Sequence, residues 1–488
     1  MKQFNKVAMI ELADEYAKNG DLDKARRIYQ KVNEWNPGDF DLVCKELVCS
    51  LNVCNWQRYD YLQRVLRDTF RHKGGLAIGE PLLASPYFTA DDLLEASQRH
   101  MQGFVHPRNA SAQRTLDVTA KAGRLRIGFL GADFYNQATM HLMIGLIEEH
   151  DRNQFEYIAY DSGSSIDDPI RRRAVQAFDR FHCVSNIGND EIARMIEQDG
   201  IDILIFIRNL TDPRVGVLTQ RPAPIQVAYL YNPSGFGAPA VDFLIADSVI
   251  VPPEFEHHYS ERIARLPFSY QPNDRHRPLP QECTRLEFGL PEGRVVLANL
   301  GSPFKITPTM FDIWCRILRE HPQCVLWLLQ TKITVAENLR LEASLRGIDP
   351  ARMYFAPLEA IPRHITRLSC ADLMLDTHPY GGHTGSSDAL WAGVPVLTLV
   401  GETFASRVAA SLLNAAGLSE LAARSETEYV DLASRLIEDR RALAAYRSHL
   451  VSRRMSLPLF DVCSYARDFE NLLLDLWSER SASAGRLL

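Results

Sequence analysis

Short apolar runs recur along the chain from residue 124 onward, and each has the length of a buried strand. The first group covers residues 125–131, 155–160, 201–207, 225–231 and 243–246. Helical stretches lie between several of these runs. This alternation predicts a parallel β-sheet that is covered by helices.

A second group of apolar runs follows a proline-rich passage near residues 270–290. It covers residues 295–300, 324–329, 353–355, 373–375 and 396–400. Together, the two groups predict two consecutive Rossmann-like lobes with a cleft between them. Ligands of such folds bind beyond the carboxyl ends of the strands.

The N-terminal part of the chain has the pattern of helices. Residues 6–39 match the length, about 34 residues, and the spacing of a tetratricopeptide repeat. The matching positions are small, aromatic or helix-terminating: Ala13, Tyr16, Gly20, Ala25, Tyr29, Val32 and Pro37. One repeat cannot bury its own apolar face, so we expect it to stack on residues 40–73, although these contain no second clear repeat.

Composition narrows the class of protein. The 488 residues carry 54 Lys plus Arg and 61 Asp plus Glu, a formal charge of −7, so we expect no nucleic-acid partner. No apolar run reaches the roughly 18 residues of a membrane span, and the first residues lack the apolar core of a signal peptide. The nine cysteines are scattered without zinc-site spacing. These features predict a cytoplasmic, reduced protein.

The segment DTHPYGGHTGSSDALWAGVPVL, residues 376–397, carries the candidate chemistry. It predicts a glycine-rich loop followed by a helix over residues 386–392. The first turn of such a helix has free N–H groups and a positive dipole end, which suit an anion. Gly381 and Gly382 would allow the anion to approach the backbone closely.

Several polar side chains of this segment could serve the same ligand. His383, Thr384 and Ser386 could donate hydrogen bonds to a phosphate, and Asp388 could accept one from a ribose hydroxyl. An ordinary loop with a helix cap is the alternative interpretation, because a single glycine-rich loop is a weak signal.

Two common nucleotide-binding motifs are absent from the sequence, which restricts the function further. The first strand is followed by Gly131-Ala-Asp-Phe-Tyr rather than GxGxxG, and the chain has no GxxxxGK[ST]. Both a dehydrogenase and a P-loop kinase are therefore disfavoured. Two Rossmann-like lobes with the nucleotide on the second are the plan of GT-B glycosyltransferases. These need no metal, since a helix dipole and cationic side chains neutralise the leaving diphosphate.

Three long motifs resemble one known family. They are GHTGSSDALWAGVPVLTLVGETFASRVAASLLNAAGL (382–418), RPAPIQVAYLYNPSGFG (221–237) and GADFYNQATMHLM (131–143). The chain resembles the O-GlcNAc transferase and SPINDLY family, glycosyltransferase family 41, in a compact bacterial form. The resemblance covers nearly the whole chain and implies an α/β fold of GT-B type, preceded by an all-α tetratricopeptide-like region.

The resemblance also implies three domains. Residues 1–123 would form the helical region and its linker. Residues 124–275 would form the first Rossmann-like lobe, on the acceptor side. Residues 276–480 would form the second lobe, on the nucleotide-sugar side, with a returning C-terminal helix.

In this family a uridine-diphosphate site lies on the second lobe. Lys305 matches the lysine that contacts the diphosphate and supports departure of the leaving group. His364 and Arg367 match the pair beside the uracil and ribose. From the residues alone, Lys305 could instead be a structural lysine at a helix start, and the other two could belong to a solvated helix face.

The glycine-rich loop matches the family at five further positions. His383 and Thr384 would lie at the pyrophosphate, and Asp388 would bind the ribose. Gly382 and Gly385 would allow the backbone to approach the nucleotide. A packed loop histidine is the alternative interpretation for His383.

The sugar and acceptor side departs from the family. Gln137-Ala138 stands where family members have His-Pro, and Gln cannot act as a base although it can bind a sugar. His141 lies close by in sequence, and Pro233 lies in an altered turn; with Gln137 they form the expected acceptor and sugar side. Ser302 replaces a family Gln or Asn. Asp133 and Asp199 are candidates for assisting deprotonation of the acceptor.

The resemblance implies an inverting protein glycosyltransferase. It would move a sugar, with N-acetylglucosamine as the default, from a UDP-sugar to Ser or Thr of a protein docked near the helical repeat. The UDP-sugar would be the donor substrate, with no cofactor and no metal. One alternative is transfer of glucose or an unusual sugar to flagellin or an adhesin, on Ser, Thr or Asn. Another is a catalytically weak, repeat-containing binding protein. The oligomeric state stays open.

Overall fold

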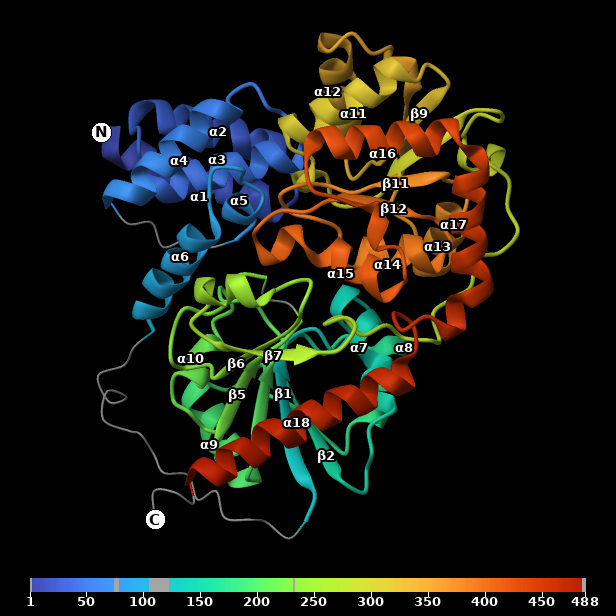
Figure 1. The fold of residues 1–488 in the computed structure, drawn as a ribbon. Coiled ribbons are helices and arrows are strands. Elements are labelled where there is room, and N and C mark those ends of the chain that lie inside the picture. Colours follow the sequence, from blue (N-terminus) through green and yellow to red (C-terminus); the bar gives the residue numbers. More distant parts are fainter. Residues whose placement is uncertain (1, 74–78, 105–122, 231–232, 485–488) are drawn as a thin grey trace. The chain divides into compact units, whose positions relative to one another are not determined.

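The structure is a computed structural model that describes residues 2–73, 79–104, 123–230 and 233–484. The chain forms two compact units. The first comprises Met1–Thr89, Pro278–Leu413 and Leu418–Arg454, and the second comprises Ala90–Arg277, Asn414–Gly417 and Met455–Leu488. Each unit contains one parallel sheet (Figure 1).

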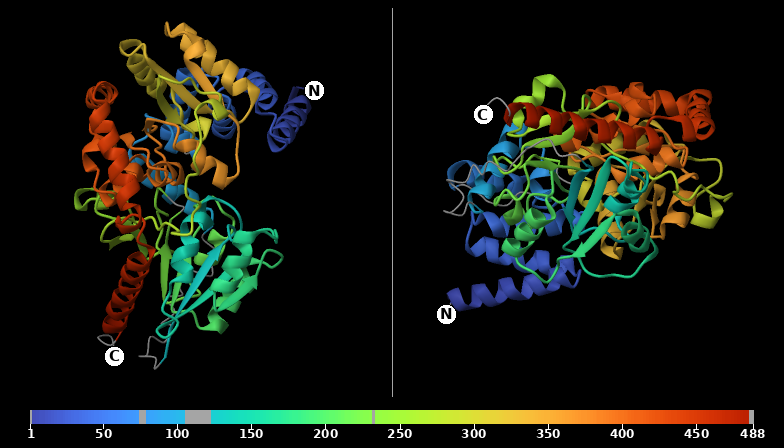
Figure 2. Two further views of the ribbon diagram at one scale, coloured as in Figure 1. Left: turned by 90° about the vertical axis from the view of Figure 1, so that its right-hand side faces the viewer. Right: turned by 90° about the horizontal axis from the view of Figure 1, so that it is seen from below.

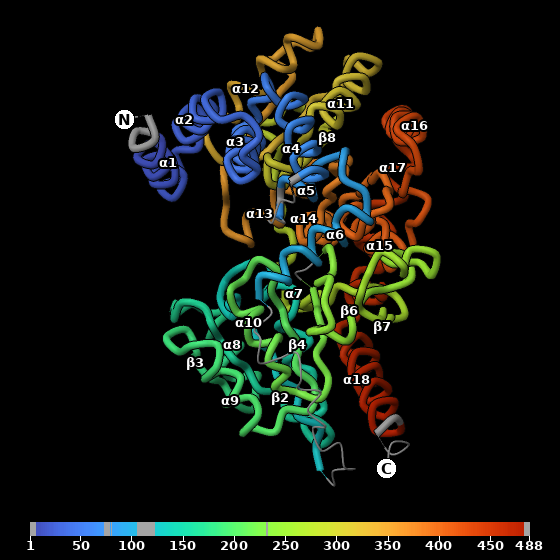
Figure 3. Tube along the Cα trace, turned by 90° about the vertical axis from the view of Figure 1, so that its left-hand side faces the viewer, coloured from blue at the N-terminus to red at the C-terminus, as the bar shows by residue number. Residues whose placement is uncertain are grey.

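The first unit begins with helices that lie side by side (Figure 3). They are α1 (Lys2–Lys18), α2 (Leu22–Trp35), α3 (Phe40–Asn52), α4 (Tyr59–Lys73) and the short α5 (Glu80–Leu83). Ala13 and Ala25 are fully buried where α1 meets α2, and Tyr29 packs beside them. Asp21 caps α2 by accepting a hydrogen bond from the Lys24 N–H. The predicted tetratricopeptide-like pair is therefore present, and its core continues onto α3.

The sheet of the first unit has the strand order β10-β9-β8-β11-β12-β13, and every neighbouring pair is parallel. Its strands are β8 (Val295–Asn299), β9 (Cys324–Leu329), β10 (Met353–Ala356), β11 (Leu373–Leu375), β12 (Val396–Leu399) and β13 (Ala422–Ala423). Five of these were predicted, within one residue at each end. Only the two-residue β13 was missed, because so short a strand carries no pattern.

Helices connect the strands of this sheet. They are α11 (Pro308–Glu320), α12 (Ile333–Leu345), α13 (Ile361–Leu368), α14 (Thr384–Trp391), α15 (Val408–Ala415), α16 (Glu426–Glu438) and α17 (Arg440–Arg453). A short 3₁₀ turn, η4 (Pro303–Lys305), follows β8. It packs against α3, and the thiol of Cys54, which follows α3, lies 3.7 Å from the Pro303 carbonyl oxygen. The repeat helices thus support a turn at the carboxyl end of β8.

The sheet of the second unit has the order β3-β2-β1-β4-β5-β6-β7 and is also fully parallel. Its strands are β1 (Leu125–Gly131), β2 (Phe155–Asp161), β3 (Arg180–Cys183), β4 (Ile203–Phe206), β5 (Ile225–Ala228), β6 (Phe243–Asp247) and β7 (Arg262–Leu266). The edge strands β3 and β7 were missed, since charged residues interrupt their apolar pattern.

The helices of the second unit are α6 (Ala90–Gln102), α7 (Ala138–Glu148), α8 (Pro169–Ala177), α9 (Asn189–Asp199), α10 (Val215–Leu218) and α18 (Val462–Ala484). The long α18 runs along this unit (Figure 2). Its Tyr465 donates a hydrogen bond of 2.5 Å to the Tyr270 carbonyl. None of the helices in the described ranges has both the length and the apolar character needed to cross a membrane.

These contacts group two segments by packing rather than by sequence order. Helices α1 to α5 belong to the first unit, with the sheet of β8 to β13. Helix α18 belongs to the second unit, with the sheet of β1 to β7. The two-lobed GT-B architecture is confirmed. The boundaries at residues 123, 275 and 480 stay predictions.

Candidate functional site

The candidate site lies at the carboxyl ends of β8 and β11 in the first unit. The strand order reverses at this point, because β9 and β10 follow on one side of β8 and β11 to β13 lie on the other. Such a switch point is where open α/β sheets bind ligands. Asn299, the last residue of β8, joins the two strand ends by donating a 2.7 Å hydrogen bond to the Leu375 carbonyl.

A buried carboxylate organises the glycine-rich loop. Asp376 is fully buried directly after β11 and accepts hydrogen bonds from the Gly382 N–H at 2.6 Å and the Thr398 hydroxyl at 2.8 Å. A Cβ on Gly382 would lie only 2.3 Å from the Ser386 hydroxyl oxygen, and one on Gly381 would lie 3.0 Å from Asp376. The loop therefore folds tightly around the carboxylate, which explains why both positions are glycine.

The helix after this loop, α14, begins at Thr384, two residues earlier than predicted. Its N-cap is His383, whose side chain makes no capping hydrogen bond. His383 Nε2 and the Ser386 hydroxyl are both buried, and neither has a hydrogen-bond partner among the described residues. Buried polar atoms are normally satisfied, so these two atoms beside a free helix N-terminus indicate a ligand site. Burial, with Lys305 as a second cause, holds the pKa of His383 well below its ordinary value.

Lys305 faces the same loop from η4. Its Nζ donates a 2.7 Å hydrogen bond to the Gly381 carbonyl and lies 4.0 Å from the centroid of the Tyr380 ring. Phe304 packs edge-on against that ring, with centroids 5.6 Å apart. A cation, a helix N-terminus and two unsatisfied polar atoms thus surround one short loop, a combination that suits a diphosphate.

His364 and Arg367 lie on α13, beside α14. Arg367 is 2% exposed, and its Nη2 donates a 2.9 Å hydrogen bond to His364 Nδ1. The His364 Nδ1 is thus an acceptor, so the ring proton sits on Nε2, which lies 3.9 Å from an Asp388 carboxylate oxygen. Burial, then the Arg367 charge, lowers the pKa of His364 to about 4. A solvated helix face is therefore excluded for this pair.

All eight residues predicted for the nucleotide site are on or beside α14 and its loop. Thr384 and Gly385 open the helix, and a Cβ on Gly385 would meet no atom within 4 Å. Asp388 is buried one turn further along. Sequence reasoning overlooked Asp376 and Tyr380. The position of Asp376, first after an apolar strand, was the available signal.

The residues predicted for the acceptor side lie in the second unit. Asp133 follows β1, is 6% exposed and accepts a 2.6 Å hydrogen bond from Arg208. Burial raises the pKa of Asp133, and Arg208 opposes the effect. Gln137 caps α7: its oxygen accepts from the Thr139 N–H at 3.1 Å, and its amide lies 3.3 Å from the Asp133 carbonyl. Arg208, which follows the neighbouring strand β4, was missed as a partner of Asp133.

The other residues predicted for this side are His141, Pro233 and Asp199, each of which has its own set of contacts. His141 Nε2 lies 2.6 Å from the Asn136 side-chain oxygen, and burial lowers the pKa of its imidazole. Pro233 is buried in its turn. Asp199, at the end of α9, is held by the Tyr160 hydroxyl at 2.6 Å and by Arg180 at 2.5 Å. Asp199 precedes β4 and Asp133 follows its parallel neighbour β1, so the two carboxylates lie at opposite edges of the sheet.

Asp376 should make the stability of the protein depend on pH. Burial raises its pKa to about 6, against about 3.9 in an unfolded chain. The folded protein therefore binds a proton on Asp376 more tightly than the unfolded chain does. The stabilisation from this proton is complete below about pH 4 and is lost as the pH rises to about 6. The loss amounts to about 3 kcal/mol at most. Urea denaturation of the wild type and Asp376→Asn from pH 4 to 7 measures it. A constant difference between the two proteins would contradict the prediction.

Comparison with known proteins identifies the family. Residues 100–282 and 278–469 match the sequence model of glycosyl transferase family 41. The chain belongs to this family. An Arabidopsis thaliana member, the probable UDP-N-acetylglucosamine–peptide N-acetylglucosaminyltransferase SEC, is 33% identical over 413 residues, which are 82% of this chain and 42% of the relative. The Caenorhabditis elegans UDP-N-acetylglucosamine–peptide N-acetylglucosaminyltransferase is 29% identical over 468 residues, covering 72% of this chain and 41% of the relative.

A solved structure resembles the chain over nearly its whole length. The structure of a Thermobaculum terrenum O-GlcNAc transferase mutant superposes with a TM-score of 0.85 at 25% sequence identity, covering 98% of this chain and 92% of that one. By contrast, the chain spans about two-fifths of the length of the curated relatives that it matches.

Proposed function

We propose that this family 41 protein transfers a sugar from a UDP-sugar to Ser or Thr hydroxyls of proteins, with inversion at the anomeric carbon. The observation that carries the proposal is the arrangement of Lys305 and the N-terminus of α14 around one glycine-rich loop. N-acetylglucosamine is the proposed sugar, because the relatives from Arabidopsis and C. elegans are named for that donor.

In this proposal the diphosphate lies over the first turn of α14. Lys305 Nζ exchanges the Gly381 carbonyl for a phosphate oxygen, and His383, Thr384 and the free N–H groups bind the remaining oxygens. Negative charge grows on the diphosphate as the glycosidic bond breaks, so these groups stabilise the transition state more than the ground state. The reaction then needs no metal, since Lys305 and the helix dipole supply the positive charge.

The nucleoside is proposed to lie along α13 and α14. The His364 Nε2–H and the Arg367 guanidinium face the uracil and ribose, and the Asp388 carboxylate accepts from a ribose hydroxyl. Arg367 fixes the His364 tautomer through Nδ1, so the imidazole presents a donor rather than an acceptor to the nucleoside.

For the acceptor, we place the target protein near the α1 to α4 helices. Gln137, His141 and Pro233 are proposed for the acceptor and sugar side. Asp133 is the proposed proton acceptor, because burial raises the pKa of its carboxylate and makes it a stronger base. The contacts of Asp199 give no support to a catalytic role. All nine cysteines are free thiols, which fits the proposed cytoplasmic location.

Intact-mass spectrometry tests the proposal. Candidate acceptor proteins are incubated with the enzyme and a panel of UDP-sugars, with Lys305→Ala run in parallel. A Lys305-dependent gain of one sugar mass would establish transfer and identify the sugar. UDP binding without transfer from any donor of the panel would instead favour a binding protein on a transferase scaffold.

Removing Arg367 should take away both the hydrogen bond to His364 Nδ1 and the positive charge beside this imidazole. In Arg367→Met we expect the pKa of His364 to rise, since a neighbouring positive charge is lost, and UDP affinity to fall about tenfold, or about 1.4 kcal/mol. Histidine NMR titration and calorimetry with UDP measure the two effects. Arg363→Met is the matched control, because Arg363 is exposed on the same helix and pairs with Glu359 at 3.1 Å. Equal effects of both substitutions would refute a specific role of Arg367.

A further inference from the structure

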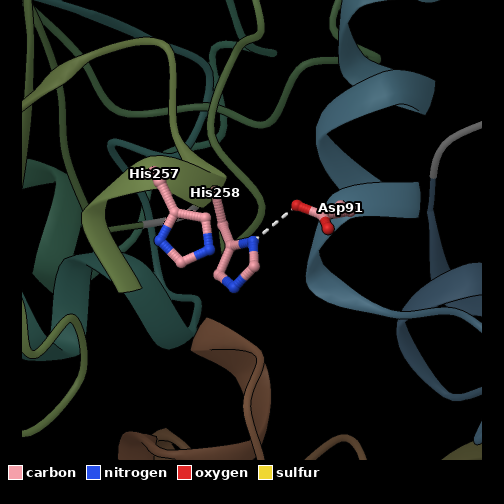
Figure 4. A group of neighbouring side chains, drawn as sticks. All are labelled: Asp91, His257 and His258. Carbon is pink, nitrogen blue, oxygen red and sulfur yellow. Dashed lines mark hydrogen bonds and ion pairs between the residues drawn. The ribbon is translucent and has the colours of Figure 1, made fainter. Parts of the chain in front are cut away.

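Three side chains with metal-binding atoms meet on the second unit, outside the residues assigned above. Asp91 is the second residue of α6, and His257 and His258 end the 3₁₀ turn η2 (Pro253–His258). One ligand atom of each lies within 4.8 Å of the others. Figure 4 shows the two imidazoles side by side, with His258 Nδ1 directed at the Asp91 carboxylate at 2.7 Å.

Close packing fixes α6, and with it the backbone of Asp91. Gly237 lies so near to this helix that a Cβ there would come within 2.5 Å of the Gln98 nitrogen. The Ser97 hydroxyl lies 3.3 Å from the Gly235 carbonyl oxygen, and His100 Nε2 lies 3.1 Å from the Leu210 carbonyl oxygen at the far end of the helix. The carboxylate therefore projects from a helix whose C-terminal half is held by these contacts.

The histidine pair is fixed by a short, constrained turn. Pro252 and Pro253 restrict the backbone where η2 begins, and the Tyr259 N–H closes the turn on the Glu256 carbonyl at 3.0 Å. The two imidazole centroids are only 3.9 Å apart, so neighbouring residues present both rings on one side. Two nitrogen ligands are thus held together before any ion arrives.

We propose that Asp91, His257 and His258 bind a divalent transition-metal ion of the zinc class. Two imidazoles and one carboxylate suit Zn²⁺, whereas Mg²⁺ and Ca²⁺ prefer oxygen ligands alone. A water molecule completes a tetrahedral site with three protein ligands. The ion replaces the hydrogen bond between His258 and Asp91, and the two atoms separate to about 3.3 Å, as metal bonds of about 2.0 Å require. The Asp91 side chain is 72% exposed and is free of the packing that would prevent this shift.

The position of the site gives the ion a structural role. The chain passes from the first compact unit to the second between Thr89 and Ala90, next to Asp91. A bound ion ties the first turn of α6 to η2, two segments that are far apart in sequence. It therefore stabilises the second unit where the chain enters it, independently of any transfer reaction.

Calorimetric titration of the untagged full chain with Zn²⁺ tests the proposal, with circular dichroism to verify folding of each variant. We expect one equivalent to bind with a micromolar Kd and to raise the Tm. Asp91→Asn, which keeps a hydrogen-bond acceptor for His258, should weaken binding at least tenfold, and the double variant His257→Ala/His258→Ala should abolish it. His276→Ala, which removes an exposed histidine of the same unit, should change nothing.

Absence of saturable binding by the wild type would overturn the proposal, as would equal binding by the double variant. Sugar transfer is assayed separately on the same variants. Because none of these residues belongs to the candidate nucleotide site, loss of Zn²⁺ binding with intact transfer, and the reverse, distinguish failure of the two proposals.

Discussion

Lys305→Ala should lower the kcat for sugar transfer by roughly 100- to 1000-fold, the cost of removing one group that stabilises developing negative charge. Lys305 is the cation whose Nζ already lies 2.7 Å from the loop carbonyl at Gly381. The charge on the diphosphate increases as the bond to the sugar breaks, so the effect should fall on kcat more than on KM. Steady-state kinetics with the donor identified by mass spectrometry measures both constants.

A second lysine provides the matched control for this prediction. Lys332 is exposed, lies in the same unit and is the N-cap residue of α12. Its Nζ lies beside the repeat region, 3.5 Å from where a Cβ on Gly20 would be. Lys332→Ala should therefore leave kcat and KM unchanged. If Lys305→Ala raised KM for the donor but left kcat intact, Lys305 would serve ground-state binding only, and the assigned role in leaving-group departure would be refuted.

Much of this site could be predicted because its parts are close in sequence or follow strands. Lys305 comes directly after β8 and the glycine-rich loop directly after β11, so the rule for parallel sheets places both at one edge. Gly381 and Gly382 were predicted from the need for close backbone approach. The structure shows that a buried carboxylate, Asp376, also requires them.

The interactions that could not be predicted from the sequence depend on packing between residues that are far apart along the chain. The hydrogen bond from Arg208 to Asp133 joins residues 75 positions apart, and no local pattern marks it. The packing of η4 also joins distant residues: α3 contacts this turn, and Cys54, just after α3, lies against the Pro303 carbonyl. Edge strands β3 and β7 were missed for another reason: partial exposure allows charged residues into them, which removes the apolar run that marks a strand.

Gly382→Ala should destabilise the first unit by about 1–3 kcal/mol and reduce UDP affinity by about 100-fold. The new methyl carbon would lie 2.3 Å from the Ser386 hydroxyl oxygen and 3.0 Å from Asp376. The loop must shift to relieve this overlap, and the shift displaces the Gly382 N–H from Asp376 and His383 from its place before α14. Thermal unfolding and calorimetry with UDP measure the two losses.

Gly385→Ala is the matched substitution three residues later. Its methyl group would meet no atom within 4 Å, and alanine in a helix is favoured over glycine by about 0.5–1 kcal/mol, so stability should stay the same or rise. If the diphosphate binds over the first turn of α14, this methyl group obstructs it, and UDP affinity falls although the fold is intact. Weakened UDP binding by both variants, with lost stability in Gly382→Ala alone, would separate the two functions of the loop. Unchanged affinity in Gly385→Ala would place the diphosphate away from this turn, and Lys305 and His383 would then have to bind it from the other side of the loop.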